Sequence, residues 1–109
     1  MKAGDIILIP FPFAEYTNRK VRPSVLVCLT KDKYKDLVVS AISSVVPDRL
    51  NENEILIRPD KTNNLRTESV IKVDRIVPVK AEDVIANIGE LNKDDLAKFK
   101  RKFKNLIDE

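Results

Sequence analysis

Three segments of the chain carry polar side chains that could do chemistry at the end of a strand. The first is Arg22, which stands immediately before Pro23 at the start of an apolar run. Proline fixes its own φ and disfavours the helical region for the preceding residue, so we expect Arg22 to be extended. A guanidinium held in this way can donate two parallel hydrogen bonds to an anion. The competing interpretation is an ordinary surface ion pair with Asp5 or Glu15.

The second and third segments supply hydroxyl, amine and carboxylate groups. Ser43 and Ser44 end the apolar stretch that begins at residue 37, a position where serine is also common as a turn residue. Lys72 and Asp74 are two residues apart, so strand alternation predicts that both lie on one face. A solvated ion pair would explain that spacing equally well.

The composition excludes several kinds of catalytic site. The 109 residues contain no histidine, which removes Ser-His-Asp and Cys-His catalysis and the usual zinc sites. The acidic residues Asp48, Glu52, Glu54 and Asp60 show no recognised ligand spacing, so we expect no metal cofactor. The single cysteine, Cys28, cannot form an intramolecular disulfide, and its apolar neighbours predict a buried structural role.

Length, charge and hydropathy favour one ordinary folded domain over residues 1–109. Hydrophobic residues make up 43% of the chain and charged residues 34%. The apolar runs are much shorter than the roughly 18–20 residues of a membrane span, and Asp5 lies where a signal peptide would need its apolar stretch. We therefore expect a cytoplasmic protein. The net charge of +3 favours polyanionic partners without requiring them.

Apolar patterning predicts a mainly β protein, a small, strongly bent barrel with one helix packed on it. Pro10 and Pro12 are expected to end the first strand, so that this stretch runs along an edge or leaves the sheet, and a polar loop over 14–21 follows. One helical turn is expected over 81–86, with Gly89 as a break. The expected strands cover residues 5–9, 23–29, 37–43, 54–58, and 69–73 with 76–79, the last two close enough to form one kinked strand.

The last predicted element is an amphipathic helix that begins at Asn92 and extends to 106. Asn92 can cap its first turn, where Asp94 and Asp95 suit the helix dipole. The apolar side chains of one face recur at spacings of three and four, at Leu96, Phe99, Phe103, Leu106 and Ile107. The opposite arc is basic and is interpreted as a solvated face, formed by Lys98, Lys100, Arg101, Lys102 and Lys104.

Taken together, these segments resemble the MazF/PemK family of toxin ribonucleases in both order and spacing. In that family an initial Gly-Asp or Gly-Glu strand leads through a loop to an Arg-Pro strand start. A strand ending in Ile-Thr/Ser, a Ser-Val-(Ile/Val)-x-x-Asp segment and a C-terminal helix follow. The corresponding residues here are Gly4-Asp5, Arg22-Pro23, Ile42-Ser43 and residues 69–74. The resemblance extends over essentially the whole chain.

The resemblance implies an SH3-like barrel, a homodimer, and metal-independent cleavage of single-stranded RNA, with an antitoxin protein as partner. The substrate's own 2′-OH would attack, leaving a 2′,3′-cyclic phosphate. Arg22 matches the phosphate-binding arginine, and Ser43 replaces the usual threonine. Asp74 matches an acidic position of some members and would be the base. Lys72 stands where those members have arginine, and because the guanidinium of Arg22 is a poor proton donor, Lys72 would be the donor. Flanking RNA contacts are expected from Arg19, Lys20, Ser44, Lys61 and Arg66.

Two other functions fit the same residues. The first loop lacks the family's Gly-Ser-Glu-Gln-Gly-Gly stretch, and Thr17 stands where a glutamate is usual. The chain could therefore be a catalytically degenerate member that binds RNA or an antitoxin without cutting. It could also be an interaction module that holds protein partners, in which case it would have no affinity for RNA.

Overall fold

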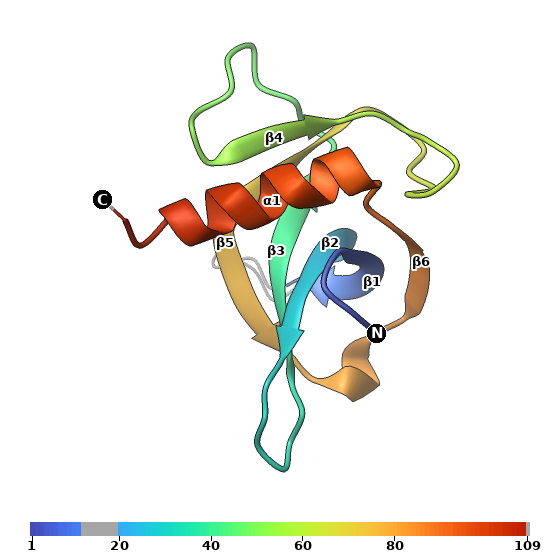
Figure 1. Cartoon of the computed structure of the whole chain (residues 1–109). Helices are drawn as coiled ribbons and strands as arrows, with labels where there is room; N and C mark the ends of the chain where they lie inside the picture. Colours follow the sequence, from blue (N-terminus) through green and yellow to red (C-terminus); the bar gives the residue numbers. More distant parts are fainter. Residues whose placement is uncertain (12–19, 109) are drawn as a thin grey trace.

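Six antiparallel strands form one sheet that curls into a half-barrel, and a single helix packs across it (Figure 1). The computed structural model describes residues 1–11 and 20–108. In the sheet the strands lie in the order β4-β5-β3-β2-β1-β6. The elements are β1 Asp5–Phe11, β2 Lys20–Leu29, β3 Leu37–Ser43, β4 Glu54–Ile57, β5 Ser69–Val79, the 3₁₀ turn η1 Ala81–Asp83, β6 Ala86–Glu90 and α1 Lys93–Asn105. The predicted mainly β fold with a C-terminal helix is confirmed.

The predicted kink between residues 73 and 76 is confirmed as a bulge within one long strand. In the pairing of β3 with β5, Ala41 lies opposite Lys72, but the preceding residue, Ser40, lies opposite Ile76. Three residues of β5 therefore bulge out of the ladder at this point. Strand β6 was not predicted, because we interpreted its Gly89 as a break.

Two predictions about the first strand were wrong. Strand β1 does not end before Pro10, which pairs with Val21, and β2 already begins at Lys20 within the predicted polar loop. The reason lies in the neighbours of β1. Strand β6 pairs with β1 only as far as Leu8, so Pro10 lies where β1 has a partner on one side alone. Proline is tolerated there because its missing N–H is not needed, which agrees with the expectation that this stretch runs along an edge.

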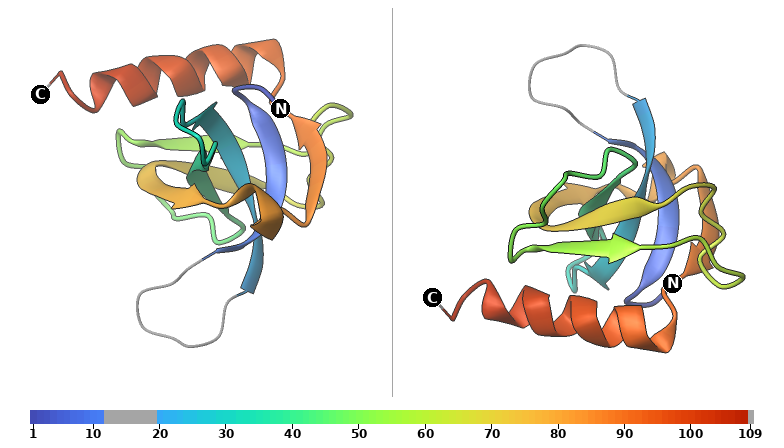
Figure 2. Two further views of the ribbon diagram at one scale, coloured as in Figure 1. Left: turned by 90° about the horizontal axis from the view of Figure 1, so that it is seen from below. Right: turned by 90° about the horizontal axis from the view of Figure 1, so that it is seen from above.

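Helix α1 covers one side of the curled sheet and completes its larger core (Figure 2). The Asn92 side chain accepts a hydrogen bond from the Asp95 backbone N–H at 2.8 Å, so the predicted cap is confirmed. The helix buries Phe99 against Ile6, Val25 and other strand residues, a contact worth about 2 kcal/mol for one large side chain. A second cluster, centred on Ile7, Leu26 and Val39, fills the other side of the sheet.

The prediction that Cys28 is buried was also wrong, because its side chain is exposed. A bulge between Leu26 and Cys28 explains the difference. Leu26 lies opposite Val39, and Cys28 lies opposite the adjacent Val38. The extra residue on β2 breaks the strict inside-outside alternation of this strand, so residues 28 and 29 face outward.

The polar segment between β4 and β5 lies along the outer edge of β6. The Asn64 side chain donates to the carbonyl of Ile88 at 2.6 Å, and the Glu90 N–H donates to the carbonyl of Thr62 at 3.0 Å. This approach requires Gly89, because a Cβ there would meet the Thr62 oxygen at 2.4 Å. The segment therefore joins the two ends of the half-barrel and forms one wall of the site described next.

Candidate functional site

Three of the predicted catalytic residues lie on one face of the sheet, in neighbouring strands. Ser24 of β2 pairs with Ala41 of β3, and Ala41 pairs with Lys72 of β5. Continuing the first pairing by two residues brings Arg22 level with Ser43. Paired residues and residues two apart in a strand share a face, so Arg22, Ser43 and Lys72 point to the same side. With strands about 4.8 Å apart, the long side chains of Arg22 and Lys72 can reach an anion bound beside Ser43.

The Ser43 hydroxyl is held in place at the end of β3. Its Oγ accepts a hydrogen bond from the Val45 backbone N–H at 3.1 Å. This bond uses one lone pair of the oxygen and leaves the hydroxyl hydrogen able to donate to another acceptor. Ser43 can therefore offer a directed hydrogen bond beside Arg22.

Glu54 is the charged neighbour of Lys72, and the sequence interpretation did not assign it to the site. The two residues pair across β4 and β5, with Lys72 Nζ 4.0 Å from Glu54 Oε2. The carboxylate is 9% exposed and its Oε1 accepts from the Asn51 N–H at 2.9 Å. The position of Glu54 beside Lys72 could have been predicted from strand alternation in the sequence. The inward residues Ile55 and Ile57 imply that Glu54 alternates onto the opposite face, beside Lys72.

Asp74 lies apart from the row formed by Arg22, Ser43 and Lys72. It is exposed within the bulge of β5, and its Oδ2 accepts from the Asn53 Nδ2 at 3.3 Å. The bulge moves the carboxylate toward the loop between β3 and β4. Asp74 is thus close in sequence to Lys72 but is held by a different segment.

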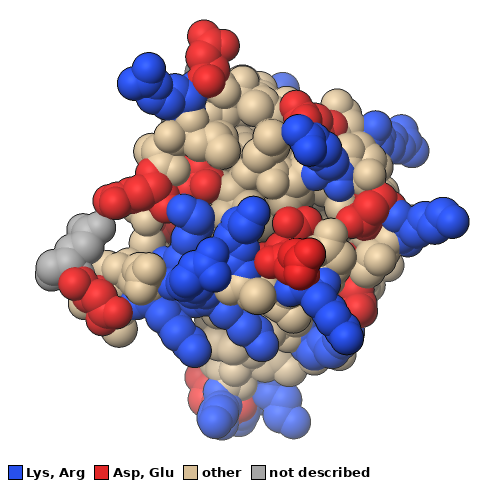
Figure 3. Space-filling view, turned by 45° about the horizontal axis from the view of Figure 1, so that its top comes forward, with Lys and Arg blue, Asp and Glu red and all other residues tan. Residues whose placement is uncertain are grey.

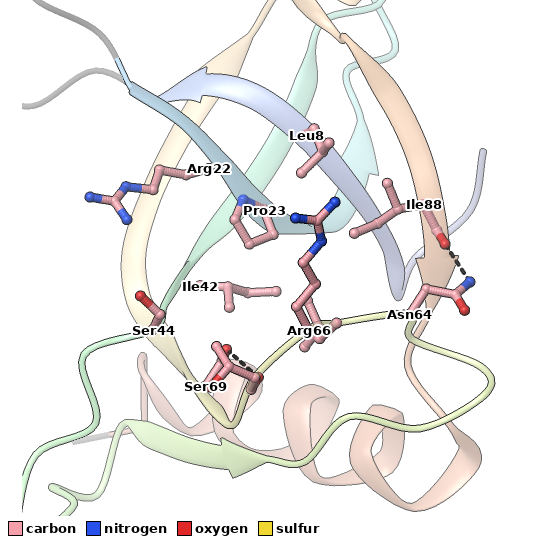
Figure 4. Close-up of a pocket in the computed structure, with 11 residues that line it drawn as sticks. Leu8, Arg22, Pro23, Ile42, Ser44, Asn64, Arg66, Ser69 and Ile88 are labelled. Atoms are coloured by element: carbon pink, nitrogen blue, oxygen red, sulfur yellow. Dashed lines mark hydrogen bonds between the residues drawn. The ribbon is translucent and has the colours of Figure 1, made fainter.

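A pocket of about 570 Å³ opens at the end of the half-barrel next to this row (Figure 4). Its lining is apolar at Leu8, Pro23, Ile42, Leu65 and Ile88, and polar at Arg22, Ser44, Asn64, Arg66, Thr67 and Ser69. The Arg66 side chain extends over the apolar residues toward Leu8 and Pro23, whereas Arg22 points away from Arg66. The pocket therefore brings three predicted residues together, Arg22, Ser44 and Arg66.

The loop that carries Arg66 is organised around the buried side chain of Asn63. Its Oδ1 accepts from the backbone N–H groups of Asp60 (3.1 Å) and Leu65 (2.9 Å), and its Nδ2 donates to the carbonyl of Arg58 (2.9 Å). Asn63 is fully buried, so these bonds cannot be replaced by water. The sequence interpretation treated this segment as a turn-rich connection and missed its structural role.

Asp60 fastens the same loop to the start of α1. Its carboxylate accepts from the backbone N–H of Asn63 at 2.7 Å and from the Asn92 side chain at 2.9 Å. The Asn63 N–H is the main cause that lowers the pKa of Asp60, against the opposing effect of partial burial. Asn92 also contacts Asp95, whose pKa is raised by burial. One asparagine therefore contacts two carboxyl groups whose pKa values are shifted in opposite directions.

The remaining predicted contact residues lie outside the pocket lining. Lys20 and Lys61 are exposed at the start of β2 and in the loop after β4, while Arg19 lies outside the described residues. Of the two carboxylates considered as partners of Arg22, Asp5 is bound instead by Lys2, with Nζ at 3.2 Å, at the far end of β1. Glu15 lies outside the described residues.

Two further features of the described part of the chain concern metals and membranes. Over residues 1–11 and 20–108, no three Asp, Glu or Cys side chains come together in a way that could hold a metal ion. In the same residues no helix combines the length and apolar character needed to cross a membrane.

Comparisons with known proteins agree with the resemblance seen in the motifs. The sequence matches the family model described as PemK-like, MazF-like toxin of type II toxin-antitoxin system over residues 2–107. Among solved structures, the fold is similar to that of the Mycobacterium tuberculosis toxin MazF-mt6, with a TM-score of 0.69 and 18% identity over 95% of this chain and 96% of that chain. A search of curated protein sequences found no match. Because the family model covers nearly the whole chain, the protein belongs to the PemK-like, MazF-like toxins of type II toxin-antitoxin systems.

Proposed function

We propose that this protein is a toxin endoribonuclease that cleaves single-stranded RNA without a metal ion. The observation that carries the proposal is the row of Arg22, Ser43 and Lys72 on one face of three neighbouring strands. A cationic fork, a hydroxyl donor and an amine around one point are suited to a phosphodiester that gains negative charge as it reacts.

In the proposed reaction the substrate supplies its own nucleophile. The 2′-OH attacks the adjacent phosphorus, the bond to the 5′ oxygen breaks, and a 2′,3′-cyclic phosphate and a 5′-OH remain. Arg22 stabilises the charge on the non-bridging oxygens, and Ser43 donates a hydrogen bond to one of them. Lys72 gives a proton to the departing 5′ oxygen. Asp74 is the base of this scheme, and because it lies in the bulge of β5 outside the row, the scheme requires the RNA strand to pass over that bulge to bring the 2′-OH within its reach.

Glu54 acts in this scheme as a positioning residue for Lys72. A half-buried lysine side chain has many rotamers, and a nearly buried carboxylate 4.0 Å away restricts the ammonium group to one side of the strand. The Asn51 N–H in turn holds the carboxylate in place. This arrangement supports a fixed position of the Lys72 amine relative to Arg22.

The neighbouring pocket is suited to one unpaired base of the same RNA strand. Its apolar residues can pack against a base, and the planar guanidinium of Arg66 can stack on the other side. Ser44, Asn64 and Thr67 offer polar groups to the edge of the base. Lys20, Lys61 and Arg19 are proposed contacts to flanking phosphates.

Family membership supports three further proposals. Type II systems pair a toxin with a protein antitoxin, so we expect a cognate antitoxin that neutralises this chain. We also expect a homodimer, which rests on the family alone, and a cytoplasmic location, which the family supports together with the pattern of the sequence.

The proposal is tested by incubating a long single-stranded RNA with the purified chain in EDTA and determining the product ends. We expect discrete cuts with cyclic-phosphate and 5′-OH ends, and their loss in Arg22→Ala. Arg49→Ala, which changes an exposed arginine in the loop after β3, is the matched control. Intact RNA that is nevertheless bound would select the alternative of a catalytically degenerate binding module. Cleavage that disappears only with EDTA would contradict the metal-independent mechanism.

A further inference from the structure

Helix α1 carries the positive charge of the whole protein. Its 13 residues include six basic and two acidic side chains, a net charge of +4, against +3 for the entire chain. The rest of the chain therefore carries a net charge of −1. Figure 3 shows the result as a dense group of Lys and Arg side chains on this side of the molecule.

Three of these basic residues form a regular stripe along the outer side of α1. Lys98, Arg101 and Lys104 recur every third residue, so they follow one another at intervals of about 4.5 Å along the helix axis. All three are exposed. In the described part of the chain, none of the salt bridges involves a residue of α1.

The helix dipole accounts for only part of this charge. Lys102 and Lys104 lie in the last turn, where cations offset the partial negative charge of the helix C-terminus. That effect fades within one turn and does not require Lys98 or Arg101. On the sequence alone we interpreted the basic arc as a solvated face. The concentration of the protein's net charge there, together with the position of the helix, changes that interpretation.

The stripe lies on the side of the sheet that α1 covers, whereas Arg22, Ser43 and Lys72 lie on the opposite side with Ala41, so the two surfaces are connected around the edge strand β4. Lys102 Nζ donates to the carbonyl of Glu52 at 2.7 Å, which joins α1 to the loop between β3 and β4. In the same loop, Asn53 holds Asp74 at 3.3 Å. A groove of about 340 Å³ separates this loop from Arg101 and also contains Glu52 and Asp108. These carboxylates disfavour a phosphate inside the groove, so a polyanion would lie over the outer stripe.

We infer that the Lys98–Arg101–Lys104 stripe is a second contact surface for single-stranded RNA. It binds the phosphate backbone of the strand where the strand continues past Asp74, independently of base sequence. The inference rests on the proposed function, because it names how the same substrate extends beyond the reaction site. Its consequence is that long RNA binds more tightly than a fragment that fills only the site.

The experiment compares two triple variants with the unmodified protein. Lys98→Gln/Arg101→Gln/Lys104→Gln neutralises the stripe, and Lys31→Gln/Lys33→Gln/Lys80→Gln removes the same charge from exposed positions outside α1. Binding is measured with 2′-O-methyl oligouridines of about 6 and about 20 nucleotides, which cannot be cut through the 2′-OH. Titrations are made at about 50 and about 200 mM salt. Circular dichroism and the thermal midpoint check that each variant is folded.

We expect the stripe variant to bind the long oligonucleotide about tenfold more weakly at low salt, with a salt slope lower by about 2. Affinity for the short oligonucleotide and the rate of cleavage of a short RNA should not change. The inference would be overturned if both triple variants lost the same affinity for the long oligonucleotide, or if neither lost any. It would also be overturned if the unmodified protein did not bind the long oligonucleotide. Binding of a polyglutamate peptide in preference to RNA would overturn it in favour of an acidic protein partner.

The same experiment separates the two proposals from each other. If the unmodified protein cuts RNA but the stripe variant behaves like the control, the stripe assignment alone is wrong. If the protein cuts no RNA but the stripe variant specifically loses affinity for the long oligonucleotide, the nuclease proposal fails and the stripe stands.

Discussion

The Arg22 row and the Arg66 pocket are adjacent, yet they are positioned by different kinds of interaction. The row depends on strand register, because the ladders that pair Ser24 with Ala41 and Ala41 with Lys72 determine where Arg22 and Ser43 lie two residues further along their strands. The pocket wall depends on a polar loop whose shape is fixed by a few bonds around Asn63. We therefore expect that the rate of cleavage (kcat) and the binding of the substrate (KM) can be changed separately in this molecule.

Substitution of the two arginines should give the largest difference between the row and the pocket. Arg22→Ala should lower kcat by about 100- to 1,000-fold, because it removes a charge-stabilising donor from the reacting phosphate. Arg66→Ala should raise KM about tenfold and leave kcat nearly unchanged, because it removes a stacking surface remote from the reacting atoms. Single-turnover cleavage of a defined RNA measures both. Equal losses of kcat in the two variants would show that row and pocket act as one unit.

Removing the centre of the loop should weaken the pocket without moving the row. Asn63→Ala leaves three backbone groups of the loop without their partner and should lower the free energy of unfolding by about 3 kcal/mol. Urea titration measures the loss, and Asn105→Ala, at an exposed helix position, is the control. Where the variant is still folded, we expect a higher KM and an unchanged kcat. A fall in kcat as large as that of Arg22→Ala would contradict the separation.

Substitution of Glu54, the neighbour of Lys72 on β4, should have a smaller effect than substitution of Arg22. Glu54→Gln keeps the acceptor for the Asn51 N–H but removes the negative charge beside Lys72, and we expect kcat to fall about tenfold. A positioning role predicts in addition that the pH profile of kcat changes, which a purely structural role would not produce. Glu52→Gln, which changes an exposed carboxylate in the loop before β4, is the matched control. An unchanged pH profile would exclude Glu54 from the reaction.

The smallest expected effect distinguishes the two carboxyl groups that share Asn92. The lowered pKa of Asp60 contributes stability that is present above its unfolded pKa of about 3.9 and is lost as pH falls through the folded value. The raised pKa of Asp95 acts in the opposite direction, so acidification through the same range favours the folded state. Thermal midpoints between about pH 6 and about pH 3 measure both.

Compared with the unmodified protein, Asp60→Asn should show a shallower loss of stability on acidification and Asp95→Asn a steeper one. Asp48→Asn, at an exposed position in the loop after β3, serves as the control. If both variants change the pH dependence of the thermal midpoint in the same direction, the Asp60 and Asp95 carboxyl groups do not have the opposite pKa shifts on which this prediction rests.

The difference between row and pocket also explains what the sequence could predict. Strand β3 and the cap at Asn92 follow from local patterning, and alternation correctly places Lys72 on the face opposite Ile71. The pocket could not be predicted, because Gly89 and Asn64 act through contacts between segments about 25 residues apart, and the local bonds of the Asn63 side chain leave no periodic pattern in the sequence. Cys28 was misplaced because a bulge depends on the partner strand and leaves little trace in its own sequence.

The polar segment over β6 has a consequence beyond the pocket. An uncovered edge strand offers a row of N–H and C=O groups to which another chain can add a strand, and such additions lead to aggregation. Here Thr62 and Asn64 already occupy groups of β6 at Glu90 and Ile88. The loop that carries Arg66 thereby limits uncontrolled sheet growth from that edge. Substitutions that break the hydrogen bonds of this loop to β6 should therefore reduce the soluble yield of the protein as well as its binding of RNA.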